Sequence, residues 1–192
     1  MLEVILLAVS GIGIYGWYFK IRWKMLVMGI PAIIGAYYIE LYFLNLSFID
    51  MFILLVVVAP IVEELLKFLC TIFGKDIKTA MSVGLMFATV ENILYYMAFS
   101  GIFFFIFSLR EFTDPLLHMT TTSFSVKAWK RRFYGIIIAI SMHSFWNYYS
   151  IQIANFPYLI FILALVYGSI LVINIRIEKT KIKNIKPLYE VN

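Results

Sequence analysis

The chain has 192 residues, of which 63% are hydrophobic and only 14% are charged. Soluble domains average about 45–50% apolar and about 25% charged residues, so a chain of this length has no water-soluble core that could bury so much apolar surface. The composition excludes a soluble globular enzyme and indicates a protein whose solvent is the lipid bilayer. The formal net charge of +5 does not indicate nucleic-acid binding, because the basic residues follow the connections between apolar segments.

Seven apolar segments follow one another, and a membrane-spanning helix needs roughly 20 mostly apolar residues. The segments expected to be helical are Leu2–Phe19, Met25–Leu44, Asp50–Phe73, Thr79–Phe99, a shorter one at Pro115–Val126, Phe133–Ile151 and Phe156–Ile175. The apolar run Gly101–Leu109 either extends the fourth helix or forms a re-entrant piece, so six to eight helices are possible. We predict an all-α fold, a polytopic membrane helical bundle of about seven transmembrane helices. Residues 1–175 form one transmembrane domain, and residues 176–192 form a basic cytoplasmic tail.

Two prolines carry further expectations about these helices. Pro60 removes a backbone hydrogen bond and should kink the third helix. Asp114 followed by Pro115 is typical of an N-cap and a proline at the first helical position. We therefore expect the short fifth helix to begin there, with His118 in its first turn.

The basic residues test the order of the spans. All but two of the 16 Lys and Arg residues lie in the connections and the tail that this scheme places on one side. The exceptions are Arg110, assigned to a connection on the opposite side, and Lys67, which lies within a span. By the positive-inside rule, the amino terminus is outside and the carboxyl terminus is cytoplasmic, in an integral protein of the cytoplasmic membrane. The first segment stays as a helix rather than a cleaved signal peptide, because its basic residues follow it.

Ionisable side chains interrupt four of the predicted spans. In chain order these polar residues are Glu63, Glu64, Lys67, Glu91, Asn92, His118, His143 and Asn147. Each unpaired charge in mid-bilayer costs about 2.5–3.5 kcal/mol, so the charged ones must face each other or a water-filled cavity. With a rise of 1.5 Å per residue, the two histidines and three of the carboxylates lie about 12–18 Å from the cytoplasmic ends of four helices that alternate in direction, namely Glu63, Glu64, Glu91, His118 and His143. The sequence thus predicts one polar layer inside the bundle. Glu40, near the outer end of its helix, is expected to reach the membrane interface instead.

Four motifs within this layer resemble those of the PrsW-type intramembrane proteases. Glu63-Glu64-Leu65-Leu66-Lys67 is similar to the EExxK motif of that family, and Phe87 with Glu91 and Asn92 is similar to its FxxxE-N motif. His118, and His143 with Asn147, resemble its two histidine motifs. The match covers about residues 59–149 and extends more distantly to the superfamily of CAAX-prenyl proteases and bacteriocin-processing enzymes (CPBP). CAAX-processing members have a histidine in place of Glu91 and an arginine one place beyond Lys67, so the PrsW branch fits better.

The resemblance implies cleavage of single-span membrane proteins, such as anti-sigma factors, near the bilayer. Peptide hydrolysis needs an activated water and a stabiliser for the tetrahedral oxyanion. We assign Glu63 as general base, Glu91 as a second group that holds the water, and His143 with Asn147 as oxyanion donors. His118 positions the substrate or joins the base network. The supporting residues are Glu64, Lys67, Asn92 and Tyr95, of which Lys67 neutralises one of the two adjacent carboxylates.

Other chemistries stay open at this point. Glu63, Glu91, His118 and His143 could form a zinc site with an open position, although the usual HExxH spacing is absent. We favour the glutamate mechanism without a cofactor, and keep zinc as the alternative. Asn92 and Tyr95 also suit simple hydrogen bonding between helices. A proton-coupled transporter, or a non-proteolytic immunity or scaffold protein, would use the same residue types. The substrate, the cleavage position and the oligomeric state do not follow from the sequence.

Overall fold

The computed structural model describes residues 2–46, 49–72, 74, 76–98, 104–126, 134–152 and 157–185. Every regular element in these ranges is a helix, which confirms the all-α prediction for the described part of the chain. The elements are α1 (Leu2–Phe19), the 3₁₀ helix η1 (Trp23–Met28), α2 (Gly29–Leu44), α3 (Met51–Ile53), the π-helical turn η2 (Leu54–Val58), α4 (Ala59–Thr71), α5 (Ile77–Ala98), α6 (Phe104–Ser125), α7 (Tyr134–Gln152) and α8 (Pro157–Ile185).

Three described stretches are long and apolar enough to cross a membrane: Trp23–Leu44, Ile77–Ala98 and Tyr158–Thr180. This finding agrees with the membrane assignment made from composition, while a total of about seven spans stays a prediction. Among the other helices, α4 has only 13 residues and carries three charged side chains. The polar residues of the candidate site therefore make this helix look less like a membrane span than its neighbours.

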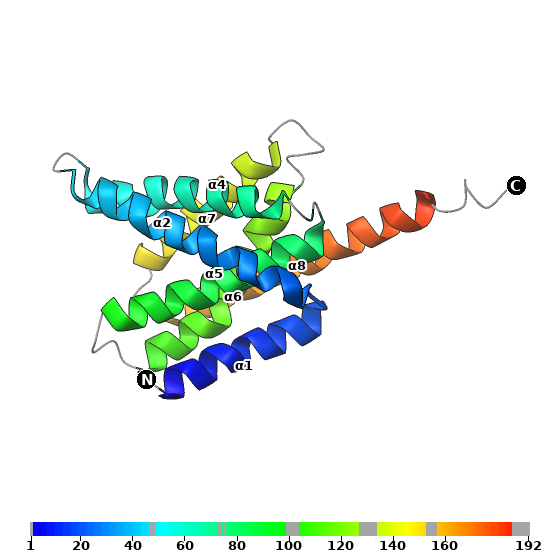
Figure 1. Cartoon of the computed structure of the whole chain (residues 1–192), viewed down its shortest axis with the longest axis horizontal. Coiled ribbons are helices and arrows are strands. Elements are labelled where there is room, and N and C mark those ends of the chain that lie inside the picture. Colours follow the sequence, from blue (N-terminus) through cyan, green and yellow to red (C-terminus); the bar gives the residue numbers. More distant parts are fainter. Residues whose placement is uncertain are drawn as a thin grey trace, which may run out of the picture.

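Helix α5 lies at the centre of the bundle and contacts α1, α2, α4 and α6 (Figure 1). Small side chains make this close packing possible, because Ala80, Ser82 and Ala88 are fully buried with exposed fractions of 0%. Gly84 faces the backbone of α6, where a Cβ atom added at Gly84 would lie only 2.7 Å from the carbonyl carbon of His118. The glycine thus sets how near α6 can approach α5.

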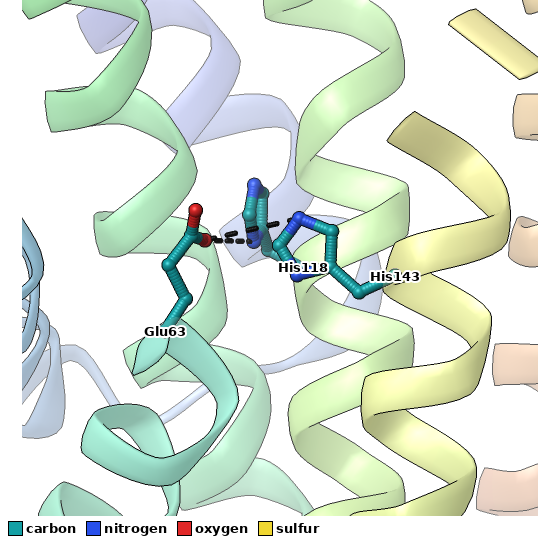
Figure 2. Close-up of side chains that lie close together, drawn as sticks. All are labelled: Glu63, His118 and His143. Atoms are coloured by element: carbon teal, nitrogen blue, oxygen red, sulfur yellow. Dashed lines mark ion pairs between the residues drawn. The ribbon is translucent and has the colours of Figure 1, made fainter. Parts of the chain in front are cut away.

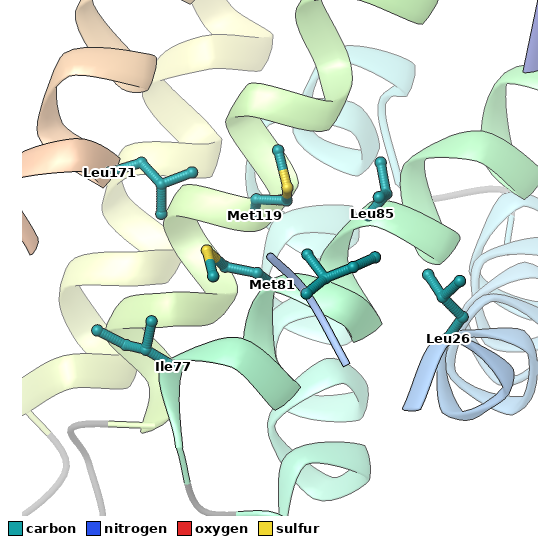
Figure 3. Packing of buried hydrophobic residues seen from close by; sticks show 7 residues of the cluster. Leu26, Ile77, Met81, Leu85, Met119 and Leu171 are labelled. Carbon is teal, nitrogen blue, oxygen red and sulfur yellow. The ribbon is translucent and has the colours of Figure 1, made fainter. Parts of the chain in front are cut away.

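An apolar cluster fills the space between these helices and α8. Its buried members are Ile21, Leu26, Ile77, Met81, Leu85, Met119 and Leu171, six of which are labelled in Figure 3. Within a membrane such a cluster stabilises the bundle through close van der Waals packing, because lipid tails are as apolar as these side chains. Because these residues come from five segments of the chain, the cluster fixes α5, α6 and α8 relative to one another.

One predicted boundary is wrong. Helix α6 begins at Phe104 rather than at Pro115, so Pro115 lies inside the helix and Asp114 is not an N-cap. Proline is tolerated there because its φ is already helical, and the cost is the N–H that would have bonded the carbonyl of Glu111. The Asp114 carboxylate instead forms an ion pair with Arg110, one turn earlier. His118 therefore lies deep in α6 and not in a first turn.

The expected irregularity near Pro60 takes the form of a π-helical turn, η2, directly before α4. In a π-helical turn each carbonyl bonds the N–H five residues ahead, as the carbonyl of Leu54 does with Ala59. The carbonyl of Leu55 would need the N–H of Pro60, which proline lacks. The local sequence thus frees one backbone acceptor inside the bundle.

The remaining predictions concern the chain ends and connections. Helix α8 runs to Ile185, so the first ten residues of the predicted basic tail are helical. Residues 104–109 of the apolar run Gly101–Leu109 form the start of α6 rather than an extension of the fourth span. The basic connection Lys127–Arg132, Lys75 and residues 186–192 lie outside the described residues.

Candidate active site

Helix α4 presents three ionisable side chains to the interior of the bundle. The exposed fractions are 5% for Glu63 and 0% for Glu64 and Lys67. Their spacing of i, i+1 and i+4 puts them on the face that α5, α6 and α7 cover. Burial of three charges at one place requires mutual pairing, which the geometry supplies.

Glu63 faces the two histidines of the chain, and both rings lie on the same side of its carboxylate (Figure 2). Its Oε2 atom is 3.9 Å from Nδ1 of His118 and 3.8 Å from Nε2 of His143. These distances are too long for direct hydrogen bonds, and they match the separation of polar atoms that share one bridging water. The histidine rings stand edge to face with centroids 5.1 Å apart, so both present a nitrogen to the same point.

A carboxylate holds the far nitrogen of each histidine. Nε2 of His118 lies 2.8 Å from Oε2 of Glu91, and Nδ1 of His143 forms a hydrogen bond of 2.9 Å with Oε1 of Glu64. Because a carboxylate accepts hydrogen bonds, these far nitrogens carry the ring hydrogens. The nitrogens that face Glu63 are therefore lone-pair acceptors in the neutral imidazoles.

Lys67 links α4 to His118. Its Nζ lies 2.6 Å from Oε1 of Glu64, 3.5 Å from Oε2 of Glu63 and 2.7 Å from Nδ1 of His118. The predicted role of Lys67 as a neutralising cation thus agrees with the geometry, since it contacts both adjacent carboxylates. The Thr121 hydroxyl donates a further hydrogen bond of 3.0 Å to Oε1 of Glu64.

A second ion-pair network lies on the other side of Glu91. The guanidinium of Arg110 is 2.7 Å from Oδ2 of Asp114 and 3.5 Å from Oε1 of Glu91. Its Nε donates a hydrogen bond of 3.0 Å to Oδ1 of Asn92, and it stacks over the ring of Tyr95 at 4.3 Å. Asn92 and Tyr95 therefore support Arg110.

Asn147 forms a hydrogen bond that connects α7 to η2. Its Nδ2 donates a hydrogen bond of 2.9 Å to the carbonyl of Leu55, the acceptor that Pro60 leaves without a helical partner. This contact fixes α7 against η2. This bond uses one of the two hydrogens of the Asn147 amide, so the predicted role of Asn147 as an oxyanion donor rests on the other hydrogen and stays a prediction.

A cavity of about 300 Å³ opens beside Glu63, and its lining includes Glu91, Arg110, His118, His143 and Asn147. A groove of about 480 Å³ between α2, α3 and α5 reaches the same carboxylates, with otherwise apolar walls. Glu40 lines both spaces, and its Oε1 is buried without a hydrogen-bond partner. The expectation that Glu40 reaches the membrane interface is wrong, since its carboxylate faces the site.

Glu63, His118 and His143 could also hold a metal ion. One ligand atom from each lies within 4.8 Å of the others, and all three residues are buried. Both histidines have a carboxylate on the far nitrogen, as metal-bound histidines usually do. Against this, the Lys67 ammonium already contacts two of the three ligand atoms. Glu91 is turned toward the far side of His118, so it would orient a ligand rather than be one.

The sequence missed three residues of this site, namely Glu40, Arg110 and Asp114. Arg110, Asp114 and His118 follow one another at intervals of four, which on a continuous helix places them on one face. That periodicity was available in the sequence, but the Asp114-Pro115 pair favoured a helix start and interrupted it. For Glu40 no sequence signal separates a cavity position from an interfacial one.

Comparisons with protein-family models, with curated proteins and with solved structures find no match to this chain. The arrangement of the polar residues is therefore the ground on which a function has to be argued.

Proposed function

We propose that the chain is an intramembrane protease that hydrolyses peptide bonds with a water activated by Glu63. The observation that carries the proposal is a pair of buried acceptors, Glu63 Oε2 and His143 Nε2, which lie 3.8 Å apart beside a cavity, while the lone pair of His118 Nδ1 accepts from Lys67. A water between these two acceptors would donate to the carboxylate and lie within reach of a peptide carbonyl. Four resembling motifs, each on a different helix, support the same assignment to a PrsW-type enzyme.

Each residue of the site has a separate role in the proposed hydrolysis. Glu63 accepts one proton of the water as the water oxygen bonds to the peptide carbonyl carbon, and it returns that proton to the amine nitrogen as the C–N bond breaks. The low dielectric strengthens the interaction of Glu63 with the water. His143 takes up a proton from solvent at Nε2 before the attack, with its charge held by Glu64, and then donates a hydrogen bond to the developing oxyanion. Lys67 offsets the charge of the two adjacent glutamates, and Arg110 offsets that of Glu91.

The substrate class follows from how the site is reached. The apolar groove along α2 and α5 opens between exposed apolar side chains such as Tyr37 and Met51 and reaches Glu63 and Glu91. An apolar segment of a single-span membrane protein suits such walls, whereas a polar soluble peptide would lose its hydration there. The cavity of about 300 Å³, whose lining includes Arg110 and Asp114, supplies a polar route for water.

The test uses the purified full-length chain, reconstituted in liposomes with a fluorescently labelled single-span protein. We expect cleavage by the wild type and a loss of about 10²–10⁴-fold in Glu63→Gln, because the variant keeps the shape of the site but cannot accept a proton. His143→Ala should lose a similar factor. Glu3→Gln, an exposed carboxylate change on α1, serves as the matched control and should cleave normally. Equal cleavage by all four proteins would contradict the assignment.

A zinc-dependent protease with the same residues is the second candidate, favoured by the spacing of Glu63, His118 and His143. Zinc would supply an activated water in place of glutamate alone. Elemental analysis of the active wild-type preparation separates the two chemistries. One equivalent of zinc, together with loss of cleavage on chelation, would overturn the metal-free mechanism.

A further inference from the structure

Two neighbouring cavities lie at the end of the bundle where α1 ends and α5 begins. The first has a volume of about 480 Å³ and is lined by five basic side chains. The second has a volume of about 460 Å³ and is largely apolar. Tyr18, Phe19, Val172 and Arg176 line both, so the two form one continuous depression with a charged part and an apolar part.

The charged part carries a surplus of positive charge. Its basic residues are Lys20, Arg22, Lys78, Arg176 and Lys179, and its acidic residues are Asp76 and Glu178. Asp76 is already engaged, because it lies 3.3 Å from the Arg22 guanidinium and accepts hydrogen bonds from backbone amides at the start of α5. Five cations against two carboxylates leave a surplus of three charges, which suits an anionic group.

The backbone conformation of Lys20 is unusual for a residue that carries a side chain. Lys20 has a φ of 52°, in the left-handed region, and the next residue, Ile21, donates its N–H to the carbonyl of Gly16. This is the helix-ending arrangement in which glycine is usual, because a side chain is strained there. This backbone turn fixes the point at which the Lys20 side chain leaves the end of α1, at the edge of the basic cavity.

The apolar part has the dimensions of one lipid tail. It lies between α1 and α8, which both pack against α6, and Leu116 of α6 is among its lining residues. Gly168 leaves the wall opposite Leu116 without a side chain. Along α8 the lining runs from Leu165 to Arg176, a rise of about 16 Å, close to the roughly 15 Å of half a bilayer core.

We propose that this depression binds an anionic phospholipid, with the phosphate in the basic cavity and one acyl chain in the groove between α1 and α8. Basic pockets between transmembrane helices are known to recognise anionic headgroups. Arg176 lies at the junction of the two parts, where the headgroup meets the chain. The joined apolar groove favours a lipid over a free anion, which would use the basic part alone.

The experiment uses the full-length chain purified in dodecyl maltoside. Dioleoyl-phosphatidylglycerol, dioleoyl-phosphatidylcholine and inorganic phosphate are titrated in parallel, with native mass spectrometry to count bound lipid and Tm as a second measurement. We expect one retained molecule of phosphatidylglycerol, bound at least about tenfold more tightly than phosphatidylcholine, since several cations each contribute. Inorganic phosphate should not raise Tm to the same extent.

Charge variants test the headgroup part. Lys20→Gln and Arg176→Gln should each weaken phosphatidylglycerol binding about fivefold, the factor expected for one cation near an anionic headgroup. Lys24→Gln is the matched control, because Lys24 is exposed only four residues away but does not line either cavity. The affinity of Lys24→Gln for phosphatidylglycerol should lie within twofold of the wild-type affinity.

Steric variants test the acyl part. Gly168→Leu should fill the groove and weaken lipid binding about tenfold, whereas Gly13→Leu, on an exposed face of α1 with open space around it, should not. If Gly168→Leu does not fold, Ser169→Leu places the same bulk at an exposed position in the groove.

Equal affinity for both lipids, equal effects of Lys20→Gln and Lys24→Gln, or full stabilisation by inorganic phosphate alone would each overturn the proposal. Unchanged binding in the groove variants would remove the acyl-chain part. None of these outcomes depends on whether the chain is a protease.

Discussion

Lys67 is the residue on which the choice between the two proposed chemistries depends. Its ammonium group is fully buried and contacts Glu63, Glu64 and His118 at 2.6–3.5 Å. A divalent ion bound to Glu63, His118 and His143 would lie within a few Å of this cation. At an effective dielectric constant of about 20, two unit charges 4 Å apart repel by ~4 kcal/mol, so Lys67 works against a metal at this point.

We predict that Lys67→Gln converts the site from one that rejects zinc into one that binds it. The variant loses the partner of two buried carboxylates and should be destabilised by about 3–5 kcal/mol. Zinc, which replaces the missing charge and coordinates the same atoms, should then raise the Tm of the variant and bind at least about tenfold more tightly than to the wild type. Thermal scans and binding titrations with zinc measure both effects.

Lys24→Gln removes a charge of the same kind at an exposed position and should leave zinc binding unchanged. If the wild type already binds zinc as tightly as Lys67→Gln, the Lys67 ammonium does not exclude the metal. That result would favour the zinc-dependent mechanism over the metal-free one.

At the scale of helices, the distance between α5 and α6 decides where His118 lies. Gly84 is the contact point, since a Cβ atom there would be 2.7 Å from the carbonyl carbon of His118 and 2.9 Å from the amide of Met119. These are backbone atoms, so only a separation of the two helices could relieve the overlap. Such a shift would carry His118 away from Glu91 and Glu63.

We predict that Gly84→Ala lowers the free energy of unfolding by about 1–3 kcal/mol through overpacking and lowers cleavage by more than its loss of folded protein explains. Gly13→Ala is the matched control, because nothing lies within 4 Å of its added Cβ. Denaturation in mild detergent and cleavage assays at equal folded concentration measure the two effects. Normal cleavage by a destabilised Gly84→Ala would show that the position of His118 tolerates this shift.

Helix periodicity explains which part of the site the sequence could predict. Glu63 and Lys67 on one helix, and His143 on another, follow from spacing and from the cost of unpaired charge in lipid. The start of α6 could not be predicted, because Asp114-Pro115 fits both a helix start and a tolerated interior proline. The position of Glu40 depends on how α2 packs against α5, which is a tertiary contact that leaves no local signal.

The hydrogen bond from Asn147 is a second tertiary contact that leaves no local signal in the sequence. Pro60 predicted an irregular helix, and a π-helical turn is present there. That the freed carbonyl of Leu55 would be satisfied by an amide 92 residues later could not be read from the sequence. The sequence located the polar residues, while tertiary packing decided which of them face the cavity and which secure the helices.

The distribution of basic residues predicts how the whole molecule is oriented in the membrane. Lys20 and Arg22 lie between α1 and η1, and Lys24 lies in the first turn of η1. Arg176 and Lys179 lie in the last part of α8, which extends beyond the other helices (Figure 1). Lys20 and Arg176 line the same cavity, so these two clusters are at the same end of the bundle. The positive-inside rule assigns that end to the cytoplasm.

We therefore predict that Lys24 and Glu178 face the cytoplasm and that Asn45, at the end of α2, faces outside. Single cysteines at these three positions, introduced into a Cys70→Ser chain, can be labelled with a membrane-impermeant maleimide on intact and on lysed cells. Asn45→Cys should react in intact cells, whereas Lys24→Cys and Glu178→Cys should react only after lysis. Because α2 separates Lys24 from Asn45, labelling of both in intact cells would show that Trp23–Leu44 does not cross the membrane.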